Sequence, residues 1–355
     1  MFVLDSHCDT PSQIHRLRDL SVDNHHAHVD FPKLKRGGVD GAFFALYVPG
    51  TMKTKEAFGY ACALLDGVEK SVAENNRSAA FACGACDALE NKANGLFSVF
   101  LGLENGSPIG GDLSRLKYFY DRGVRYVTLC HSSDNQICDS CASRVKTWGG
   151  LSPFGKEVVS EMNRLGMLID VSHVSDESFY DVLKYSTKPV VATHSCCRAL
   201  SDHPRNMTDD MIRALAEAGG VIQINFYPLF LDSGFADVLS SSGLVEIGES
   251  VEAEFIADPA NEQKRMAWNK IQDAIQALPR PSYKLIADHI DHVVELVGID
   301  HVGIGSDYDG IEVTPDGMED ISMMPKLFAE LRARGYTESD LYKIASENFF
   351  RCMNG

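Results

Sequence analysis

Residues 164–227 read RLGMLIDVSHVSDESFYDVLKYSTKPVVATHSCCRALSDHPRNMTDDMIRALAEAGGVIQINFY. Three short apolar runs in this stretch, at residues 167–171, 189–192 and 221–226, are separated by segments with helical periodicity. This alternation predicts β-α-β-α-β. Because parallel neighbours need a crossover that returns to the same edge, it indicates a parallel sheet with helices on its outside.

A histidine follows each of the first two runs. His173 and His194 are therefore expected just past the carboxyl ends of adjacent strands. In a closed βα barrel, catalytic groups gather at that rim. Two rim histidines one βα unit apart indicate a metal site, provided that other ligands converge there.

The composition is that of an acidic chain with enough apolar residues for a large core. It has 355 residues, 45% of them hydrophobic, which suits two ordinary domains or one βα barrel with insertions. A formal charge of -17 and a pI near 5.1 argue against a nucleic-acid partner. No apolar run approaches the roughly 18 residues that span a bilayer, and the start, MFVLDSHCDTP, lacks signal-peptide character. We therefore expect a cytoplasmic protein with no membrane partner, unless a leader was trimmed.

The ten cysteines are expected to be free thiols, because they show no disulfide framework. Two C-x-x-C pairs, Cys83/Cys86 and Cys138/Cys141, have a spacing found in structural zinc sites. Two expected strands and a helix separate the pairs, so a shared zinc site is the less favoured interpretation.

The first strand is expected at residues 2–9 and ends in His7-x-Asp9. Side chains two positions apart on a strand point the same way, so this imidazole and this carboxylate face one space. Residues 13–32 are polar, and their histidines are expected to be solvated loop residues and not ligands: His15, His25, His26 and His28.

Two further strands carry polar residues at their ends. Residues 97–103 are followed by Glu104 and a turn-prone Asn-Gly, and residues 125–130 are followed by His131. Position alone leaves Glu104 as a helix-side cap, an ion-pair partner or a metal bridge. Residues 132–152 have no clear period, and long ordered loops in compact domains are often functional.

The second half of the chain adds an arginine and another carboxylate pair. Arg205 precedes a helix expected at residues 211–218, and it is either a solvated charge or a planar fork for a substrate carboxylate. Residues 228–282 form the largest excursion, which we expect to cover the rim or to form a subunit contact. A glycine-rich strand at residues 301–306 then leads to Asp307 and Asp309.

Strands and helices alternate along the whole chain. Eight main strands are expected, at residues 2–9, 39–48, 97–103, 125–130, 167–171, 189–192, 221–226 and 301–306, with a minor strand at 78–82. Two helices, at 325–334 and 338–351, end the chain. The preferred fold is α/β, a (β/α)8 TIM barrel with insertions and C-terminal helices, in a single domain spanning residues 1–355.

The residues expected at the rim are all ionisable. They are His7, Asp9, Glu104, His131, His173, His194 and Asp307. Nitrogen and carboxylate ligands without thiolates suit zinc, and a shared carboxylate suits two ions roughly 3.5–4 Å apart. Two Zn²⁺ ions would keep residual positive charge beside Asp9, Glu104 and a bridging hydroxide, which can polarise a carbonyl and keep water ionised near neutral pH.

Long motifs occur in order along nearly the whole chain. They are HCDTP, LGLENG, RYVTLCHSSDN, GLSPFGKEVVSEMNRLGMLIDVSHVS, PVVATHSCCRAL, HPRNMTDDMIRAL, HVGIGSDYDG and DGMEDISMMPKL. This pattern resembles the membrane (renal-type) dipeptidase family, zinc peptidases of the amidohydrolase-like barrel superfamily. Cys8 and Thr10 depart from it, since family members commonly have Asn and Leu there. The chain also ends without the apolar tail of lipid-anchored members, so the family name is no evidence of membrane attachment.

The resemblance implies a ligand set for two zinc ions. His7 and Asp9 would bind one ion, and His173 and His194 would bind the other. Glu104 would bridge the two.

The resemblance also implies roles for the remaining rim residues. His131 would contact the substrate or the tetrahedral intermediate, and Arg205 would grip the carboxylate at the C-terminal end of the substrate. Asp307 would handle protons. Asp309 belongs to the same motif but lies further from the strand, so Asp307 is preferred.

The function expected from this resemblance is a dinuclear zinc dipeptidase that cleaves the peptide bond of dipeptides by a metal-bridging hydroxide. The first alternative is a related amidohydrolase that acts on another carboxylated amide or lactam. The second is a non-catalytic binding barrel, which needs neither two metals nor a proton-transfer carboxylate. The preferred dipeptide, its L or D configuration, the native metal and a homodimer stay open.

Overall fold

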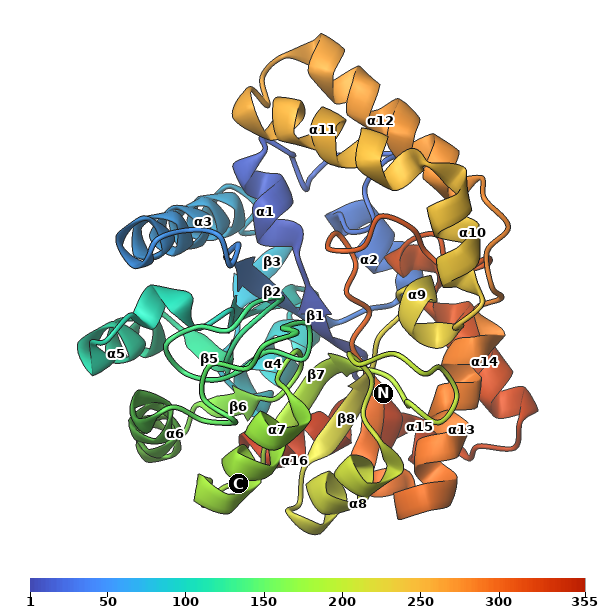
Figure 1. Cartoon of the computed structure of the whole chain (residues 1–355). Helices are drawn as coiled ribbons and strands as arrows, with labels where there is room; N and C mark the ends of the chain where they lie inside the picture. Colours follow the sequence, from blue (N-terminus) through green and yellow to red (C-terminus); the bar gives the residue numbers. More distant parts are fainter. Residues whose placement is uncertain (355) are drawn as a thin grey trace.

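Parallel strands form one sheet at the centre of the molecule (Figure 1). The computed structural model describes residues 1–354. The strands are β1 (Leu4–Cys8), β2 (Gly41–Tyr47), β3 (Ala79–Phe81), β4 (Phe97–Glu104), β5 (Val124–Thr128), β6 (Leu168–Asp170), β7 (Val191–Ser195), β8 (Val221–Ile224) and β9 (Val302–Ile304). Their order is β1-β2-β4-β5-β6-β7-β8-β9, and the short β3 pairs with β4 off this path. The predicted minor strand at residues 78–82 is thus confirmed.

The sheet closes on itself between β1 and the end of β9. Cys8 forms a parallel bridge with Tyr308, and the backbone N–H of Asp307 donates to the His7 carbonyl over 3.0 Å. The Ser6 hydroxyl on β1 reaches the carbonyl of Ile304 at 3.0 Å. These contacts complete a nearly closed barrel of eight strands, which confirms the predicted (β/α)8 fold.

Helices surround the barrel. They are α1 (Thr10–His15), α2 (Phe31–Gly37), α3 (Thr54–Glu74), α4 (Ala85–Ala93), α5 (Leu113–Asp121), α6 (Pro153–Leu165), α7 (Asp176–Tyr185), α8 (Asp209–Glu217), α9 (Pro228–Leu231), α10 (Phe235–Ser242), α11 (Leu244–Ala257), α12 (Glu262–Gln276), α13 (Lys284–Val297), α14 (Met324–Ala333), α15 (Glu338–Tyr342) and α16 (Asn348–Met353). Short 3-10 turns lie at Ser107–Ile109, Ile299–His301 and Ile321–Met323. A π-helical turn at Lys343–Glu347 joins α15 to α16, so the predicted last helix is continuous in sequence but irregular in its middle.

Helix boundaries follow from local capping. The Thr208 side chain accepts a hydrogen bond from the backbone N–H of Met211, so α8 begins at Asp209, two residues before the predicted range of 211–218. The Asp30 side chain caps α2 in the same way by accepting from Lys33. The polar segment at residues 13–32 is therefore not loop throughout, because α1 extends into it and α2 begins before its end.

Several strand ends were predicted wrongly: β8 and β9 end two residues early, at Ile224 and Ile304, and β7 ends three residues late. The apolar run at residues 189–192 marked only the beginning of β7, which runs from Val191 to Ser195, so His194 lies within the strand and not past its end. The strand continues because its polar residues are satisfied inside the barrel. Thr193 Oγ1 donates to a carboxylate oxygen of Asp170 over 2.7 Å.

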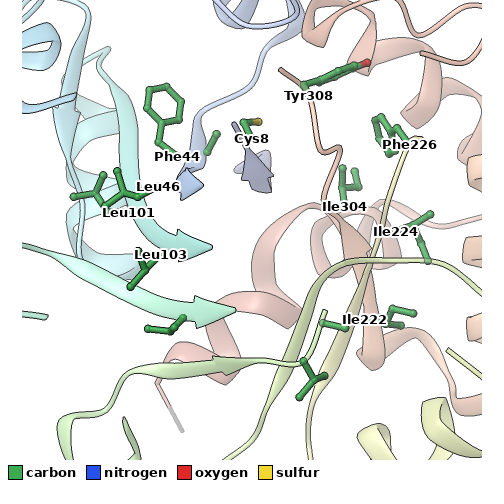
Figure 2. Close-up of a cluster of buried hydrophobic side chains, with 14 of the residues drawn as sticks. Cys8, Phe44, Leu46, Leu101, Leu103, Ile222, Ile224, Phe226, Ile304 and Tyr308 are labelled. Atoms are coloured by element: carbon green, nitrogen blue, oxygen red, sulfur yellow. The ribbon is translucent and has the colours of Figure 1, made fainter. Parts of the chain in front are cut away.

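Alternate strand residues pack on opposite sides of the barrel wall. The outward side chains, such as Phe44, Leu101 and Ile222, form the large core that Figure 2 shows in part. Aromatic side chains fill the inside of the barrel at the end opposite the rim, where the ring centroids of Phe43 and Phe100 are 4.7 Å apart. The ring centroid of Phe349 on α16 is 5.3 Å from that of Phe43, so Phe349 closes this end.

Helices α10, α11 and α12 of the 228–282 excursion gather on one side of the barrel mouth (Figure 1). Phe235 and Ile275 from this excursion share a small core with Val313, which follows β9. Arg16 at the end of α1 forms an ion pair of 2.9 Å with Glu252 of α11. Within residues 1–354, each helix is too short or too polar to cross a lipid bilayer.

Candidate metal centre and substrate cavity

Five predicted ligands from five places in the sequence meet at the barrel mouth. They are His7 on β1, Asp9 just after it, Glu104 at the end of β4, His173 after β6 and His194 on β7. All lie at the carboxyl ends of parallel strands, which share one edge of a barrel. The convergence that the sequence predicted is therefore present in the structure.

Glu104 lies between two groups of these ligands. Its Oε2 is 3.4 Å from His7 Nε2, and its Oε1 is 3.1 Å from His173 Nε2 and 3.4 Å from His194 Nε2. His7, Asp9 and Glu104 form one group whose ligand atoms lie within 4.8 Å of one another. Glu104, His173 and His194 form the other, so the groups share one carboxylate.

The ligand atoms have the arrangement that cations require. His173 Nε2 and His194 Nε2 approach to 2.9 Å, and a proton on Nδ1 of His194, beside Thr193 Oγ1, leaves a lone pair on its Nε2. His7 Nε2 and Asp9 Oδ1 are buried and have no hydrogen-bond partner. Buried polar atoms are almost always satisfied, so these orphan atoms fit a pair of bound metal ions.

A second layer of hydrogen bonds orients the histidines. The Tyr126 hydroxyl lies 2.8 Å from His7 Nδ1, and Thr193 Oγ1 lies 2.8 Å from His194 Nδ1. Thr193 donates its own proton to Asp170, so it accepts the proton of His194 Nδ1. Both contacts leave Nε2 free to face the cavity, as second-layer partners of metal ligands do.

This second layer was not predicted from the sequence. Tyr126, Asp170 and Thr193 lie inside strands that were interpreted only as apolar runs. The available signal was polar residues at alternate positions in LID and VATHS, where a strand interior carries Asp170 and Thr193.

Several residues of the site have a left-handed backbone. The φ angles are 74° at Asn105, 70° at His173, 65° at Asp307 and 67° at Asp309. Non-glycine residues rarely adopt this conformation, and such strain clusters at functional sites where surrounding contacts hold it. At His173 the carbonyl accepts the backbone N–H of Cys141 over 2.8 Å.

His131 lies at the edge of the ligand cluster. Its Nε2 is 3.7 Å from Glu104 Oε1, and its ring centroid is 4.2 Å from that of His173. Burial, and secondarily the positive charge of Arg205, lowers the pKa of His131 to about 3. A neutral imidazole at this place can donate a hydrogen bond into the cavity without carrying a charge.

Arg205 is buried beside the same cluster. Its Nη1 donates to Ser195 Oγ over 2.8 Å, and its Nη2 donates to the His194 carbonyl over 2.6 Å. Its Nε is buried without a hydrogen-bond partner. Arg205 is thus fixed in place, and its side chain lines the cavity.

The two carboxylates after β9 differ in their surroundings. Asp309 accepts from Arg18 at 2.6 Å and from Thr10 at 2.9 Å, so its charge is already satisfied by protein. Asp307 accepts only from the amide of Asn225, at 2.9 Å, and its other oxygen is 3.9 Å from His7 Nε2. Burial raises the pKa of Asp307 to about 7. Asp307 therefore has the environment of a proton carrier and Asp309 that of a structural anchor.

A cavity of about 590 Å³ opens over these residues, and we call it the rim cavity. This volume lies within the roughly 300–1,000 Å³ range of small-molecule sites. Its floor holds Asp9, Glu104, His131, His173, Arg205 and Asp307. Glu252, Ile256, Trp268 and Gln272 of the 228–282 excursion line it as well.

The cysteine pairs are not part of a metal centre. Cys83 and Cys86 are exposed, whereas Cys138 is buried, and every cysteine is free. None of the candidate metal-binding groups found among residues 1–354 contains a cysteine.

A (β/α)8 barrel with histidine and carboxylate side chains gathered at its rim is typical of metal-dependent barrel hydrolases. The pattern that describes the membrane dipeptidase family (Peptidase family M19) matches residues 1–355. The chain belongs to this family, which confirms both the resemblance and the expected dipeptidase function.

Related sequences are dipeptidases. The chain is 30% identical over 376 residues to an uncharacterised dipeptidase of Schizosaccharomyces pombe, with 98% of this chain and 79% of that protein covered. It is 31% identical to dipeptidase aclJ of Aspergillus oryzae, with 96% of this chain and 73% of that protein covered.

Solved structures agree with this family. The probable dipeptidase PvdM from Pseudomonas aeruginosa has a TM-score of 0.84 at 28% identity, with 99% of this chain and 94% of that chain covered. A metallopeptidase from Rhodobacter sphaeroides, liganded with a phosphinate mimic of the dipeptide L-Ala-D-Ala, has a TM-score of 0.82 at 25% identity. That match covers 100% of this chain and 99% of the other.

Proposed function

We propose that this chain is a dinuclear zinc dipeptidase whose metal ligands are His7, Asp9, Glu104, His173 and His194. The observation that carries the proposal is the position of Glu104, which belongs to both ligand groups. Nitrogen and oxygen ligands without thiolates suit zinc, and a carboxylate common to two groups suits a bridged pair. The phosphinate dipeptide mimic in the Rhodobacter sphaeroides relative supports a dipeptide as the substrate.

Each residue around the substrate has a distinct task in this proposal. Arg205, whose guanidinium lines the rim cavity, binds the C-terminal carboxylate. When bound, the zinc ions supply ionised water near neutral pH and polarise the scissile carbonyl. The neutral His131 donates a hydrogen bond to the oxyanion as it develops. Asp307, held by Asn225, passes a proton to the leaving amine.

We also propose that residues 1–355 form a single domain in which the 228–282 excursion covers the active site. Ile256 and Trp268 from the excursion line the rim cavity. The ion pair between Arg16 and Glu252 joins the excursion to α1. A cover of this kind limits the space available to a substrate, which favours dipeptides over long chains.

Metal analysis together with kinetics tests the proposal. The zinc-loaded protein is expected to contain two zinc ions per chain and to cleave Ala-Ala and Gly-Xaa dipeptides, with activity lost on chelation and restored by zinc. Glu104→Gln should lose zinc from both positions, whereas Glu90→Gln, at an exposed position on α4, should lose none. Faster hydrolysis of N-acyl amino acids or lactams than of any dipeptide would instead support the related amidohydrolase.

A further inference from the structure

More negatively charged than positively charged side chains line the rim cavity. The carboxylates are Asp9, Glu104, Glu252, Asp307, Asp309 and Glu312, and the guanidinium groups are Arg16 and Arg205. Protein cations pair with two of the carboxylates, since Arg16 lies 2.9 Å from Glu252 and Arg18 lies 2.6 Å from Asp309. Three more belong to the proposed metal and proton-transfer machinery. Glu312 remains.

Glu312 has no cationic partner in the protein. Among residues 1–354, no lysine, arginine or histidine forms an ion pair with it, and it stands outside both metal-ligand groups. Its side chain lies near the hydroxyl of Tyr227, a neutral group. Glu252 and Asp307 are carboxylates that line the same cavity as Glu312. An added cation would be attracted by this group of negative charges.

The backbone on either side holds Glu312 firmly. Ile311 and Val313 are buried, and Val313 packs into the small core with the excursion helices. Thr314 accepts from Gln276 of α12 over 2.6 Å, and its backbone N–H donates back over 3.1 Å. Glu312 itself has an exposed side chain that faces the cavity. A rigid backbone that presents an accessible carboxylate suits a residue that recognises a substrate.

The excursion contributes two apolar side chains to the cavity lining, together with the polar Glu252 and Gln272. Ile256 of α11 is 47% exposed, and Trp268 of α12 also lines the cavity. Lysine and arginine side chains combine a long apolar stem with a cationic tip. Such a side chain can pack its stem on this wall and present its tip to Glu312.

We infer that Glu312 is a specificity-determining residue and that the rim cavity selects dipeptides that carry a basic side chain. The inference rests on the proposed dipeptidase function and names its substrate class. The substrate's own α-ammonium group is a poorer partner for the Glu312 carboxylate than a basic side chain is. Standard backbone geometry keeps that nitrogen roughly 2.5 Å from the carbon under attack, beside the ligand cluster to which Glu312 does not belong.

Matched pairs of substrates isolate the charge from the shape. Arg-Ala and citrulline-Ala differ chiefly in charge, as do Lys-Ala and norleucine-Ala, and the reversed dipeptides Ala-Arg and Ala-Lys show which residue Glu312 reads. The zinc-loaded enzyme should prefer the basic member of a pair by about tenfold or more in kcat/KM, as hydrogen bonds to charged groups typically provide. Glu312→Gln should abolish that preference and leave Ala-Ala hydrolysis within about twofold.

Two further variants sharpen the test. Glu312→Lys should reverse the preference toward dipeptides with an acidic side chain. Glu249→Gln, at an exposed position of α11 outside the cavity lining, should keep the wild-type preference. Equal kcat/KM for basic and neutral partners, unaltered by Glu312→Gln, would overturn the inference while leaving the dipeptidase intact. An equal loss on all dipeptides in Glu312→Gln would also overturn it, because the carboxylate would then serve a common group. Failure to cleave any dipeptide would refute the proposed function and this inference with it.

Discussion

Tyr126→Phe is expected to weaken zinc binding without unfolding the barrel. The substitution removes one oxygen, which lies 2.8 Å from His7 Nδ1. The ring itself remains to pack on Phe43, whose centroid is 5.1 Å away. His7 Nδ1 would retain only Thr193 Oγ1, at 3.4 Å, and that hydroxyl already serves His194 at 2.8 Å.

The size of the effect follows from this weak replacement. A buried donor that loses its partner costs about 1–3 kcal/mol, and the long contact to Thr193 places the loss near the lower end of that range. About 1.4 kcal/mol corresponds to a tenfold weaker affinity. This agrees with the roughly 10–100-fold effect of removing second-layer partners of metal ligands.

Competition with a chromophoric chelator measures zinc affinity in Tyr126→Phe and in wild type. Tyr118→Phe is the matched control, because its hydroxyl accepts from Arg122 at 2.6 Å on the outer helix α5. That control should bind zinc as wild type does. Equal zinc affinity in wild type and Tyr126→Phe would refute the idea that this hydroxyl orients His7.

Two other predictions concern turnover and stability. His131→Ala should lower kcat by about a hundredfold or more, as loss of an oxyanion donor does, while the zinc content stays at the wild-type level; turnover comparable to wild type would contradict the role of His131. For Asp309, burial raises the pKa, but Arg18 and His28 outweigh it and leave the pKa lowered. Because the folded-state pKa is the lower one, the stabilisation is present above the ordinary value of 3.8 and fades as pH falls through the lowered pKa. Urea unfolding of Asp309→Asn should therefore show a loss of about 3 kcal/mol at pH 7 that shrinks in acid, and a pH-independent loss would speak against this linkage.

Strand ends explain how much of the site could be predicted from sequence. The carboxyl ends of parallel strands meet at one rim, so each polar residue that followed an apolar run could be assigned to a common place. The strand ends alone were enough to place His7, Glu104 and His173 at the rim. Local sequence also placed α8 within two residues of its observed start at Asp209, because an N-cap acts within one turn.

The remaining features depend on contacts between distant segments. Tyr126 reaches His7 only because Gly102 on the neighbouring strand leaves room, since a Cβ there would lie 2.2 Å from the Tyr126 ring. No local pattern signals that approach. Glu312 could not be predicted either, because the cavity that it faces is lined in part by helices of the 228–282 excursion.

Gly310 provides a way to separate the two metal positions. A Cβ at this residue would lie 2.0 Å from Asp9 Oδ2 and 2.8 Å from Asp307 Oδ1, closer than side-chain atoms tolerate. Gly310→Ala must therefore displace the Asp9 carboxylate. Asp9 belongs to one ligand group only, whereas His173 and His194 belong to the other.

If wild type holds the two zinc ions proposed above, Gly310→Ala is expected to hold one per chain and to lose most of its activity. Metal analysis after gel filtration measures the difference. Gly59→Ala in α3 is the control, because nothing lies within 4 Å of its added methyl group. In a helix interior that change should raise stability by about 0.5–1 kcal/mol and leave the zinc content unchanged. Two tightly held zinc ions in Gly310→Ala would show that Asp9 is dispensable as a ligand, since its carboxylate cannot keep its position beside the new methyl group.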